Sequence, residues 1–316
     1  MHIPSFKHVA IAACAVAAIA ATPASAAPIQ AQLRVEGPDG TLESGRYYVN
    51  DSWTFDTAKS CGGTGDEKTL QGPTALGLLG HGTGFNRRLD PIDVSDEFDF
   101  GLFVCAIGGH TPGGNAFWGF RVNHAEAQVG ADQFALEDGD SVLWSYIDFD
   151  SGLNTGKELV LQTADDWVKR GEAADVRILE FDAEGNAMPA AGVQVAGELT
   201  DENGDATITF DQPGRAVVRG TRGSDIATAR KRFCVWEESQ DECETLPLAR
   251  IIGTAEADRL EGTSIPERIR ARKGDDHINV RDGGVVDVVS CGRGKDTVIA
   301  DEDDRIRGNC ERVKRR

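Results

Sequence analysis

The sequence predicts a mostly β protein built from several domains, because its apolar residues occur in short runs separated by turn residues. Of the 316 residues, 37 are glycine and 7% are aromatic, a balance that favours many turns and short strands over long helices. The residue pattern also changes twice along the chain. We therefore expect a signal peptide at 1–26 and three domains at 27–155, 156–246 and 247–316.

The first residues have the order of a secretory signal peptide. Lys7 and His8 precede an alanine-rich apolar run at 9–21, and Ala24-Ser25-Ala26 fits the small-residue cleavage pattern. The run is too short to cross a bilayer as a helix, and no later stretch is apolar and long enough to insert into a membrane. We expect cleavage after Ala26 and a secreted, extracellular product.

The cysteines agree with export. Cys14 falls in the signal peptide, and the six that remain form three local groups. An even number of cysteines in an oxidising compartment indicates disulfides. We predict the pairs Cys61–Cys105, Cys234–Cys243 and Cys291–Cys310. Neither a CxxC motif nor a nearby pair of histidines supports a metal site at these cysteines.

The net charge of −19 comes from 52 acidic and 33 basic residues. Such an acidic chain repels phosphate backbones, so we do not expect nucleic acid as a partner. The acidity serves either solubility or the binding of a divalent cation, and the second interpretation requires a motif.

In the first domain, residues 32–36 alternate like an opening strand, and 37–40 form a turn. Residues 69–79 are expected to form a short helix. Two firmer strands follow at 117–123 and 141–146, and the turn signal Asp138-Gly139-Asp140 lies between them.

The two firmer strands each place aromatic side chains on one face. These are Trp118 and Phe120 in the first strand and Trp144 and Tyr146 in the second. The four rings either line a ligand-binding surface or form the core under a half-buried sheet.

The run "FWGFRVN" followed by "FALEDGDSVLWSY" resembles a bacterial domain of unknown function that is related to the C-terminal domain of transcobalamin. The resemblance covers roughly residues 33–148. It implies an α+β domain, mainly β, that could hold a small ligand. The chain departs from the family pattern at Cys61 and Cys105, and at His124, where the family usually has glycine. Corrinoid binding is not carried over, because in transcobalamin it also needs a helical partner domain.

The second domain has short alternating strands separated by turns, which suggests a β-sandwich. Its succession "PAAGVQV", "TDENGDATITF" and "PGRAVVRG", within roughly 157–236, resembles bacterial immunoglobulin-like or carboxypeptidase-regulatory-like modules. That resemblance implies a spacer or adhesion module without chemistry of its own.

The third domain has no aromatic residue and contains a short repeat at roughly 253–310, an acidic residue two positions before an aliphatic one. The pairs are Asp258 and Leu260, Glu267 and Ile269, Asp276 and Ile278, Asp287 and Val289, Asp296 and Val298, and Asp304 and Ile306. The period resembles the calcium-binding RTX (haemolysin-type) nonapeptide repeat. This resemblance implies a short parallel β-roll or solenoid with the aliphatic side chains inside and calcium between the turns.

The calcium sites that the resemblance implies are Asp258, Asp276, Asp287 and Asp296. Most glycine positions of the motif are filled by other residues, which adopt the required positive φ only at a cost. The alternative is that the acids cap turns or pair with Arg259, Arg268 and Arg305. In that case Cys291–Cys310 would hold the last turns together.

Motifs of catalysis are missing from the sequence. It has no H-E-x-x-H zinc motif, no G-x-S-x-G elbow and no phosphate-binding glycine loop. His81 and His110 lie in glycine-rich segments that are expected to be loops, and they would form a metal site only if the fold brought them together.

The sequence therefore favours a secreted, non-enzymatic modular binding or cell-surface interaction protein. Its partner would be an extracellular protein, a glycan or a small ligand. The alternatives are a small-ligand carrier that uses the four aromatic residues, and an enzyme whose site is built from loops.

Overall fold

The chain folds into short strands arranged in several sheets, with a single α-helix in the part that the computed structural model describes. The described residues are 29–49, 53–83, 86–99, 101–239, 249–262, 267–281, 286–302 and 304–315. The predicted mostly β, multi-domain fold is confirmed. The predicted signal peptide, 1–26, lies outside the described residues.

The N-terminal unit, residues 29–155, combines a sheet with a layer of short elements. Its elements are β1 (Ile29–Gly37), β2 (Gly40–Val49), β3 (Thr54–Asp56), η1 (Lys59–Cys61), β4 (Glu67–Thr69), α1 (Ala75–Thr83), η2 (Arg87–Leu89), β5 (Ile92–Ser95), β6 (Phe103–Ile107), β7 (Ala116–Val122), β8 (Ala125–Glu126) and β9 (Ser141–Asp148). The sheet order is β8-β7-β9-β1-β2. All neighbours are antiparallel except β1 and β9, which are parallel.

The helix α1 begins later than the sequence predicted. Gly72 and Pro73 precede it, and a proline disfavours helical backbone in the residue before it. Thr74 then caps the helix, because its Oγ1 accepts the N–H of Gly77 at 3.0 Å. The apolar side chains of α1 pack on Leu33 and Val35 of β1 to form the core of this unit.

The middle unit, whose described residues are 156–239, packs sheets face to face. Its strands are β10 (Glu158–Thr163), β11 (Trp167–Lys169), β12 (Ala173–Phe181), β13 (Ala187–Pro189), β14 (Gln194–Val195), β15 (Glu198–Leu199), β16 (Asp205–Thr209), β17 (Gly214–Val218), β18 (Gly220–Thr221) and β19 (Lys231–Trp236). One sheet contains β10, β12, β13 and β16, and another contains β11, β19 and β17. Ile178 and Ile208 from the first share a core with Phe233 from the second.

The C-terminal unit, whose described residues lie between 249 and 315, is a parallel solenoid with two sheets. Its strands are β20 (Ala249–Ile252), β21 (Arg259–Glu261), β22 (Glu267–Lys273), β23 (His277–Asn279), β24 (Val288–Arg293), β25 (Thr297–Ala300), β26 (Arg305–Ile306) and β27 (Arg312–Arg315). Successive strands alternate between the sheets β20-β22-β24-β26 and β21-β23-β25-β27. One coil therefore uses two of the short repeats.

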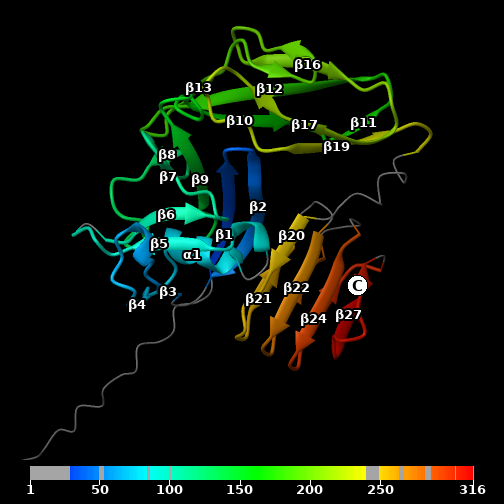
Figure 1. Ribbon diagram of the computed structural model, residues 1–316. Helices are drawn as coiled ribbons and strands as arrows, with labels where there is room; N and C mark the ends of the chain where they lie inside the picture. The colour runs from blue at the N-terminus through cyan, green and yellow to red at the C-terminus, as the bar shows by residue number, and fades with distance from the viewer. Residues whose placement is uncertain are drawn as a thin grey trace, which may run out of the picture.

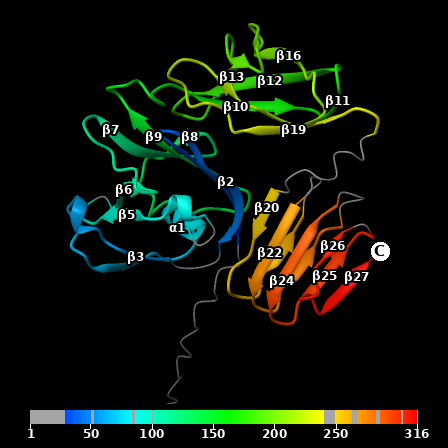
Figure 2. The same ribbon diagram turned by 45° about the vertical axis from the view of Figure 1, so that its right-hand side comes forward.

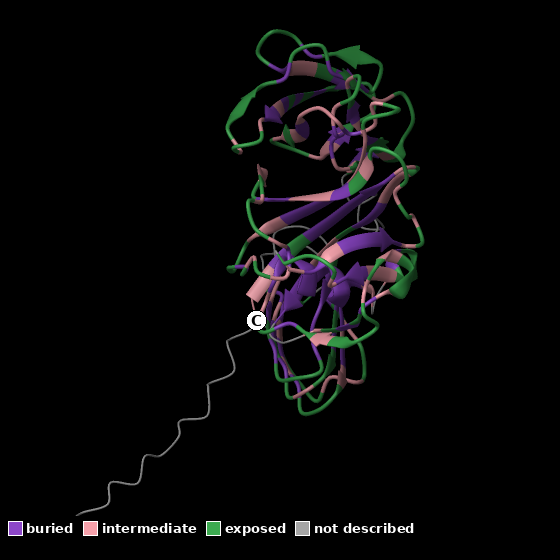
Figure 3. Cartoon of the chain, turned by 60° about the vertical axis from the view of Figure 1, so that its left-hand side comes forward, coloured by how far each residue is buried: buried purple, intermediate pink, exposed green. Residues whose placement is uncertain are grey.

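The solenoid continues the sheet of the N-terminal unit. Strand β20 pairs in parallel with β2, so that nine strands form one sheet from β26 to β8. In Figures 1 and 2 the solenoid stands beside the N-terminal unit, and the middle unit lies across one end. Figure 3 shows buried stretches along strands throughout the molecule, and the described residues divide into three apolar clusters, one centred on each unit.

Candidate functional site

The four aromatic residues singled out in the sequence lie together on β7 and β9. The antiparallel register places Trp118 opposite Tyr146 and Phe120 opposite Trp144. The rings of Phe120 and Trp144 are stacked with centroids 5.0 Å apart, and those of Trp118 and Tyr146 meet edge to face at 5.4 Å. Trp118 and Trp144 are buried, whereas Phe120 and Tyr146 are half-buried.

A hollow of about 540 Å³ opens over this aromatic face. Trp118, Phe120 and Trp144 line it together with Leu102, the first two residues of β6 and residues 127–131 of the loop after β8. Tyr146 supports Trp118 but does not line the hollow. The structure therefore brings three of the four predicted residues to one cavity wall.

Few polar side chains line the hollow. The indole N–H of Trp118 donates to the carbonyl of His110 at 2.9 Å. The indole N–H of Trp144 is buried and has no acceptor among the residues that the structure describes. Asp99, Gln128 and Gln133 complete the polar lining. Aromatic walls with a few polar groups are typical of sites for small molecules.

The predicted disulfide Cys61–Cys105 is present and supports one wall of the hollow. It ties η1 to β6, whose Val104 lines the hollow. The two cysteines are 44 residues apart in sequence, and in the chain-entropy model closing such a loop contributes about 4 kcal/mol.

The other cysteines are placed as follows. The predicted pair Cys291–Cys310 is present in the last coil of the solenoid. Cys234 is buried and disulfide-bonded, and its predicted partner, Cys243, lies outside the described residues.

The acids of the repeat form two ladders inside the solenoid. On one side, the backbone N–H of Asp258 donates to Asp276 and that of Asp276 to Asp296, each at 2.9 Å, and that of Asp296 donates to Glu311 at 2.8 Å. On the other side, Glu267 donates to Asp287 at 2.7 Å and Asp287 to Asp304 at 2.8 Å. Asp276, Asp296, Asp287 and Asp304 thus each accept a backbone N–H from the coil before them.

The glycines that remain in the repeat fit the tight stacking of the coils. Gly274, Gly292 and Gly294 have φ of +118°, +113° and +150°. A Cβ on any of them would lie within 2.0 Å of a carbonyl oxygen of the neighbouring coil. Only glycine adopts a positive φ at low cost and also leaves room for the carbonyl oxygen of the neighbouring coil.

Burial makes the ladder acids hard to ionise. The pKa of Asp276 is raised to about 7, mainly by burial, and the charges of Asp258 and Asp296 contribute to that rise. Burial also raises the pKa of Asp258 and of Asp296. One carboxylate oxygen of Asp276, and one of Asp296, is buried without a partner among the described residues.

The acidic side chains alone do not form a calcium cage. Calcium takes six to eight oxygen ligands, whereas no three Asp, Glu, His or Cys side chains converge in the part of the chain that the structure describes. A calcium ion at Asp258, Asp276, Asp287 or Asp296 would need backbone carbonyls as well as the spare carboxylate oxygens. Calcium binding by this unit stays a prediction.

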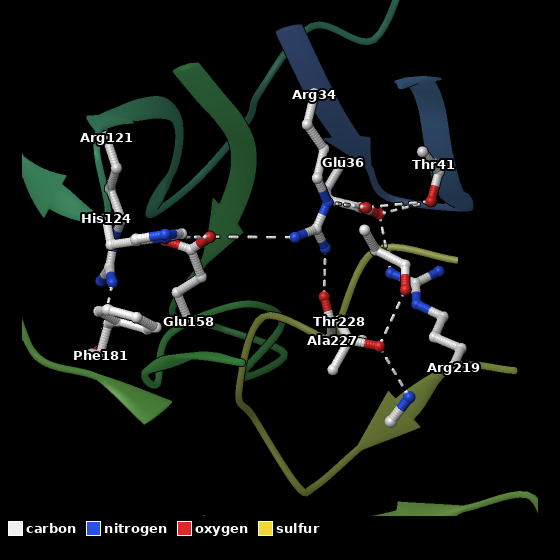
Figure 4. A network of polar contacts seen from close by, with 12 residues as sticks. Arg34, Glu36, Thr41, Arg121, His124, Glu158, Phe181, Arg219, Ala227 and Thr228 are labelled. Atoms are coloured by element: carbon white, nitrogen blue, oxygen red, sulfur yellow. Dashed lines mark hydrogen bonds and ion pairs between the residues drawn. The ribbon is translucent and has the colours of Figure 1, made fainter. Parts of the chain in front are cut away.

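A buried network of charges joins the N-terminal and middle units (Figure 4). Arg34 of β1 donates to Glu36 at 2.7 Å, and Arg219 from the middle unit reaches the other oxygen of Glu36 at 2.8 Å. Arg34 and Glu36 are 7% and 1% exposed. Removing one partner of such a network would leave an uncompensated buried charge.

His124 and Glu158 extend this network across the junction (Figure 4). Nδ1 of His124 lies 3.1 Å from Glu158, which is 3% exposed. His124 has a φ of +74°, a left-handed conformation that favours glycine, and its ring stacks on Phe181 with the centroids 4.0 Å apart. The network thereby positions the two units relative to one another.

Sequence reasoning missed this junction. Arg34 and Glu36 alternate with Leu33 and Val35 and therefore read as the solvent-facing side of an opening strand. The middle unit covers that side, and no local signal in β1 shows it.

The histidines do not form the metal site that the sequence left open. His81 lies in α1 rather than in a loop, and its ring meets those of Tyr47 and Trp53 at 6.2 Å and 5.9 Å. The pKa of His81 is lowered to about 4, mainly by burial, and the charge of Arg272 contributes to that shift. His110 contributes its backbone carbonyl to Trp118.

The comparison with protein families finds a match to part of the chain. Residues 91–148 match a domain of unknown function, DUF4430. The match covers β5 to β9 and includes Trp118, Phe120, Trp144 and Tyr146. No curated protein and no solved structure matches the chain.

Proposed function

We propose that this protein is an exported, non-catalytic binding protein whose N-terminal unit holds a small ligand in the hollow over β7 and β9. The observation that carries the proposal is the cavity of about 540 Å³ lined by Trp118, Phe120 and Trp144. Its size falls in the range of cavities that take small molecules. In this proposal the middle unit is a spacer, and the solenoid stabilises the N-terminal unit by extending its sheet.

The lining chemistry supports a ligand with a flat apolar part and a hydrogen-bond acceptor. Phe120 and the two indoles offer ring faces and edges to a planar group. The buried N–H of Trp144 lacks an acceptor among the described residues, and an unpaired buried donor costs about 1–3 kcal/mol. A ligand oxygen or nitrogen that reached it would recover part of that free energy.

The lining also supports a role without catalysis. Among the described residues that line the hollow, the only titratable side chain is that of Asp99. Nucleophilic and acid–base mechanisms need at least two groups in mutual reach.

Export is supported by the two disulfides Cys61–Cys105 and Cys291–Cys310, since such bonds persist in oxidising compartments. None of the helices in the described part of the chain is long and apolar enough to cross a membrane. The resemblance to the transcobalamin-related domain also supports a ligand-cradling sheet, and corrinoid is not part of the proposal.

The test uses the fluorescent dye anilinonaphthalene sulfonate, an aromatic anion, as the probe. Ala127 lines the hollow, so Ala127→Trp should fill it and weaken dye binding by about tenfold, equivalent to about 1.4 kcal/mol. Ala187→Trp, at an exposed position of β13, makes the same change away from the hollow and should bind the dye like the wild type. Thermal unfolding of both variants is measured to establish that they are folded.

Equal dye affinity in the wild type and in folded Ala127→Trp would contradict the proposal. It would show that the dye, and the ligand class that it represents, does not use this cavity.

A further inference from the structure

The solenoid separates its charges by direction. The six repeat acids named above are buried. On β22 the alternation is strict: Glu267, Ile269 and Ala271 are buried, and the side chains of Arg268 and Arg270 are exposed. Because these six acids are inside, exposed arginines outnumber exposed acids in the described part of the unit, where Glu256, Asp275, Glu302 and Glu311 are the exposed acids.

Four of these arginines lie close together on the outer face of the sheet β20-β22-β24-β26, and we call them the arginine face: Arg250, Arg268, Arg270 and Arg305. Arg250 is the direct neighbour of Arg268. Arg268 is the neighbour of Val288, which is the neighbour of Arg305. Neighbouring strands are about 4.8 Å apart, so three arginines form one row across four strands. Arg270 lies two residues further along β22.

The arginine face is poorly neutralised within the described part of the chain. Arg268, Arg270 and Arg305 form no ion pair there. Arg250 has one long contact, 3.7 Å, with Glu43, and its own side chain is 49% exposed. Like charges on adjacent strands repel and do not stabilise a sheet. A stabilising role therefore does not explain the row.

Positive charge continues from the arginine face onto the middle unit. Partial desolvation lowers the pKa of Arg232, whose side chain keeps an exposed part, and the nearby positive charges of Arg215, Arg250 and Arg230 add to the shift. The side chains of Arg215, Arg230 and Arg232 are exposed. The basic surface thus spans two units of a chain whose net charge is −19.

We propose that the arginine face binds a linear anionic polysaccharide. The face is part of a sheet and offers four guanidinium groups on neighbouring strands, which a polymer with repeated sulfate or carboxylate groups can contact simultaneously. At physiological ionic strength charges are screened over about 8 Å. The distant acids of the chain therefore do not cancel the attraction at this face.

The residue types favour a polysaccharide over other polyanions. No Phe, Trp or Tyr occurs after residue 248, so the face has no rings on which nucleic-acid bases could stack. The same absence leaves no aromatic anchors of the kind that hold a protein in a membrane surface. Recognition by charge alone is what the face provides.

The experiment measures binding of the full mature chain to immobilised dextran sulfate, with neutral dextran as the blank. The double variant Arg268→Glu/Arg270→Glu should weaken binding at least about tenfold. It should also reduce the steepness of the salt dependence, because fewer counterions are released. Both positions are exposed, and surface substitutions change stability by about 0.5 kcal/mol or less.

The matched control is Arg259→Glu/Arg312→Glu, which makes the same change of charge on the opposite sheet. Arg259 and Arg312 are exposed there on β21 and β27. This control should bind within about twofold of the wild type. If either Arg→Glu double variant has a lower unfolding temperature than the wild type, the corresponding Arg→Gln double variant replaces it. Weaker binding to dextran sulfate is then expected only for the substitutions at positions 268 and 270.

Three results would overturn the proposal. The first is no binding of the wild type to dextran sulfate at physiological salt. The second is equal weakening by the two double variants, which would indicate attraction by overall charge. The third is equal or tighter binding to a single-stranded oligonucleotide or to phosphatidylserine vesicles, which would assign the face to those partners instead. The hollow belongs to the N-terminal unit, whereas these substitutions are in the C-terminal unit. Dye binding to the hollow therefore tests the proposed function separately from polysaccharide binding to the arginine face.

Discussion

At the scale of single residues, the charged and polar side chains that the fold buries are the least expected from the sequence. His81 reads as a loop residue between glycines, yet it is 8% exposed and packs in α1 against Tyr47 and Trp53. The glycines beside it allow this, since a Cβ at Gly80 would lie 2.5 Å from the indole of Trp53. A sequence pattern shows that glycine is present but not which ring it makes room for.

The pH dependence of stability should report the burial of His81. Its folded-state pKa is lowered from 6.5 to about 4, so the unfolded chain binds a proton at this residue more readily. The stability that the neutral ring contributes is present above pH 6.5 and is lost as the pH falls through 6.5 towards 4. We expect the unfolding temperature of His81→Phe to fall less between pH 7 and pH 4.5 than that of the wild type.

The control for this measurement is His277→Phe, at an exposed position of β23. It should follow the wild type across the same pH range. Parallel pH profiles of the wild type and His81→Phe would show that His81 does not couple protonation to folding.

At the scale of elements, the repeat predicted the coils of the solenoid well, because its period depends on local residue types. Leu260, Ile269, Ile278, Val289 and Val298 are fully buried, as the repeat requires. The sequence did not predict the partner of each acid, which lies two repeats away. That spacing arises because successive repeats alternate between two sheets. Acids on the same side of the solenoid are therefore one full coil, or two repeats, apart.

The cation requirement of the solenoid can be tested by thermal unfolding with millimolar calcium and then with a chelator. If calcium binds the folded coils, it raises the midpoint by mass action, by about 2.7 kcal/mol at a hundred times its dissociation constant. Asp276→Asn should abolish that shift, because it keeps an acceptor for the N–H of Asp258 but carries no charge. Magnesium serves as the control ion.

An unfolding midpoint that is the same in calcium and in chelator would remove the cation from the C-terminal unit. The hydrogen-bonded ladders and Cys291–Cys310 would then hold the coils without it.

At the scale of the whole molecule, the solenoid depends on the unit before it. Strand β2 supplies the edge on which β20 pairs, and Tyr48 of β2 lies in the apolar cluster of the solenoid. The hydroxyl of Tyr48 accepts the backbone N–H of Glu261 at 2.9 Å and the side-chain amide of Gln30 at 2.9 Å. The first coil is thereby covered by the N-terminal unit and does not end in open solvent.

Removing this contact should weaken the joint between the two units. Tyr48→Phe leaves the N–H of Glu261 without its acceptor, which should lower the free energy of unfolding by about 1–2 kcal/mol in urea. Tyr146→Phe removes a hydroxyl that has no hydrogen bond among the described residues. This control should change the free energy of unfolding by about 0.5 kcal/mol or less. The same destabilisation in both variants would argue against the joint.

The sequence by itself determined the mostly β fold, the disulfides Cys61–Cys105 and Cys291–Cys310, and the aromatic faces of β7 and β9. Those features depend on periodicity, turn residues and the proximity of cysteines along the chain. Only the tertiary structure decided which faces are covered. It buried Arg34 and Glu158 at a junction, opened the hollow beside Trp144, and turned Arg268 and Arg270 outward in register with their neighbours. Such outcomes depend on how separate sheets pack, and packing between distant segments leaves no local pattern in the sequence.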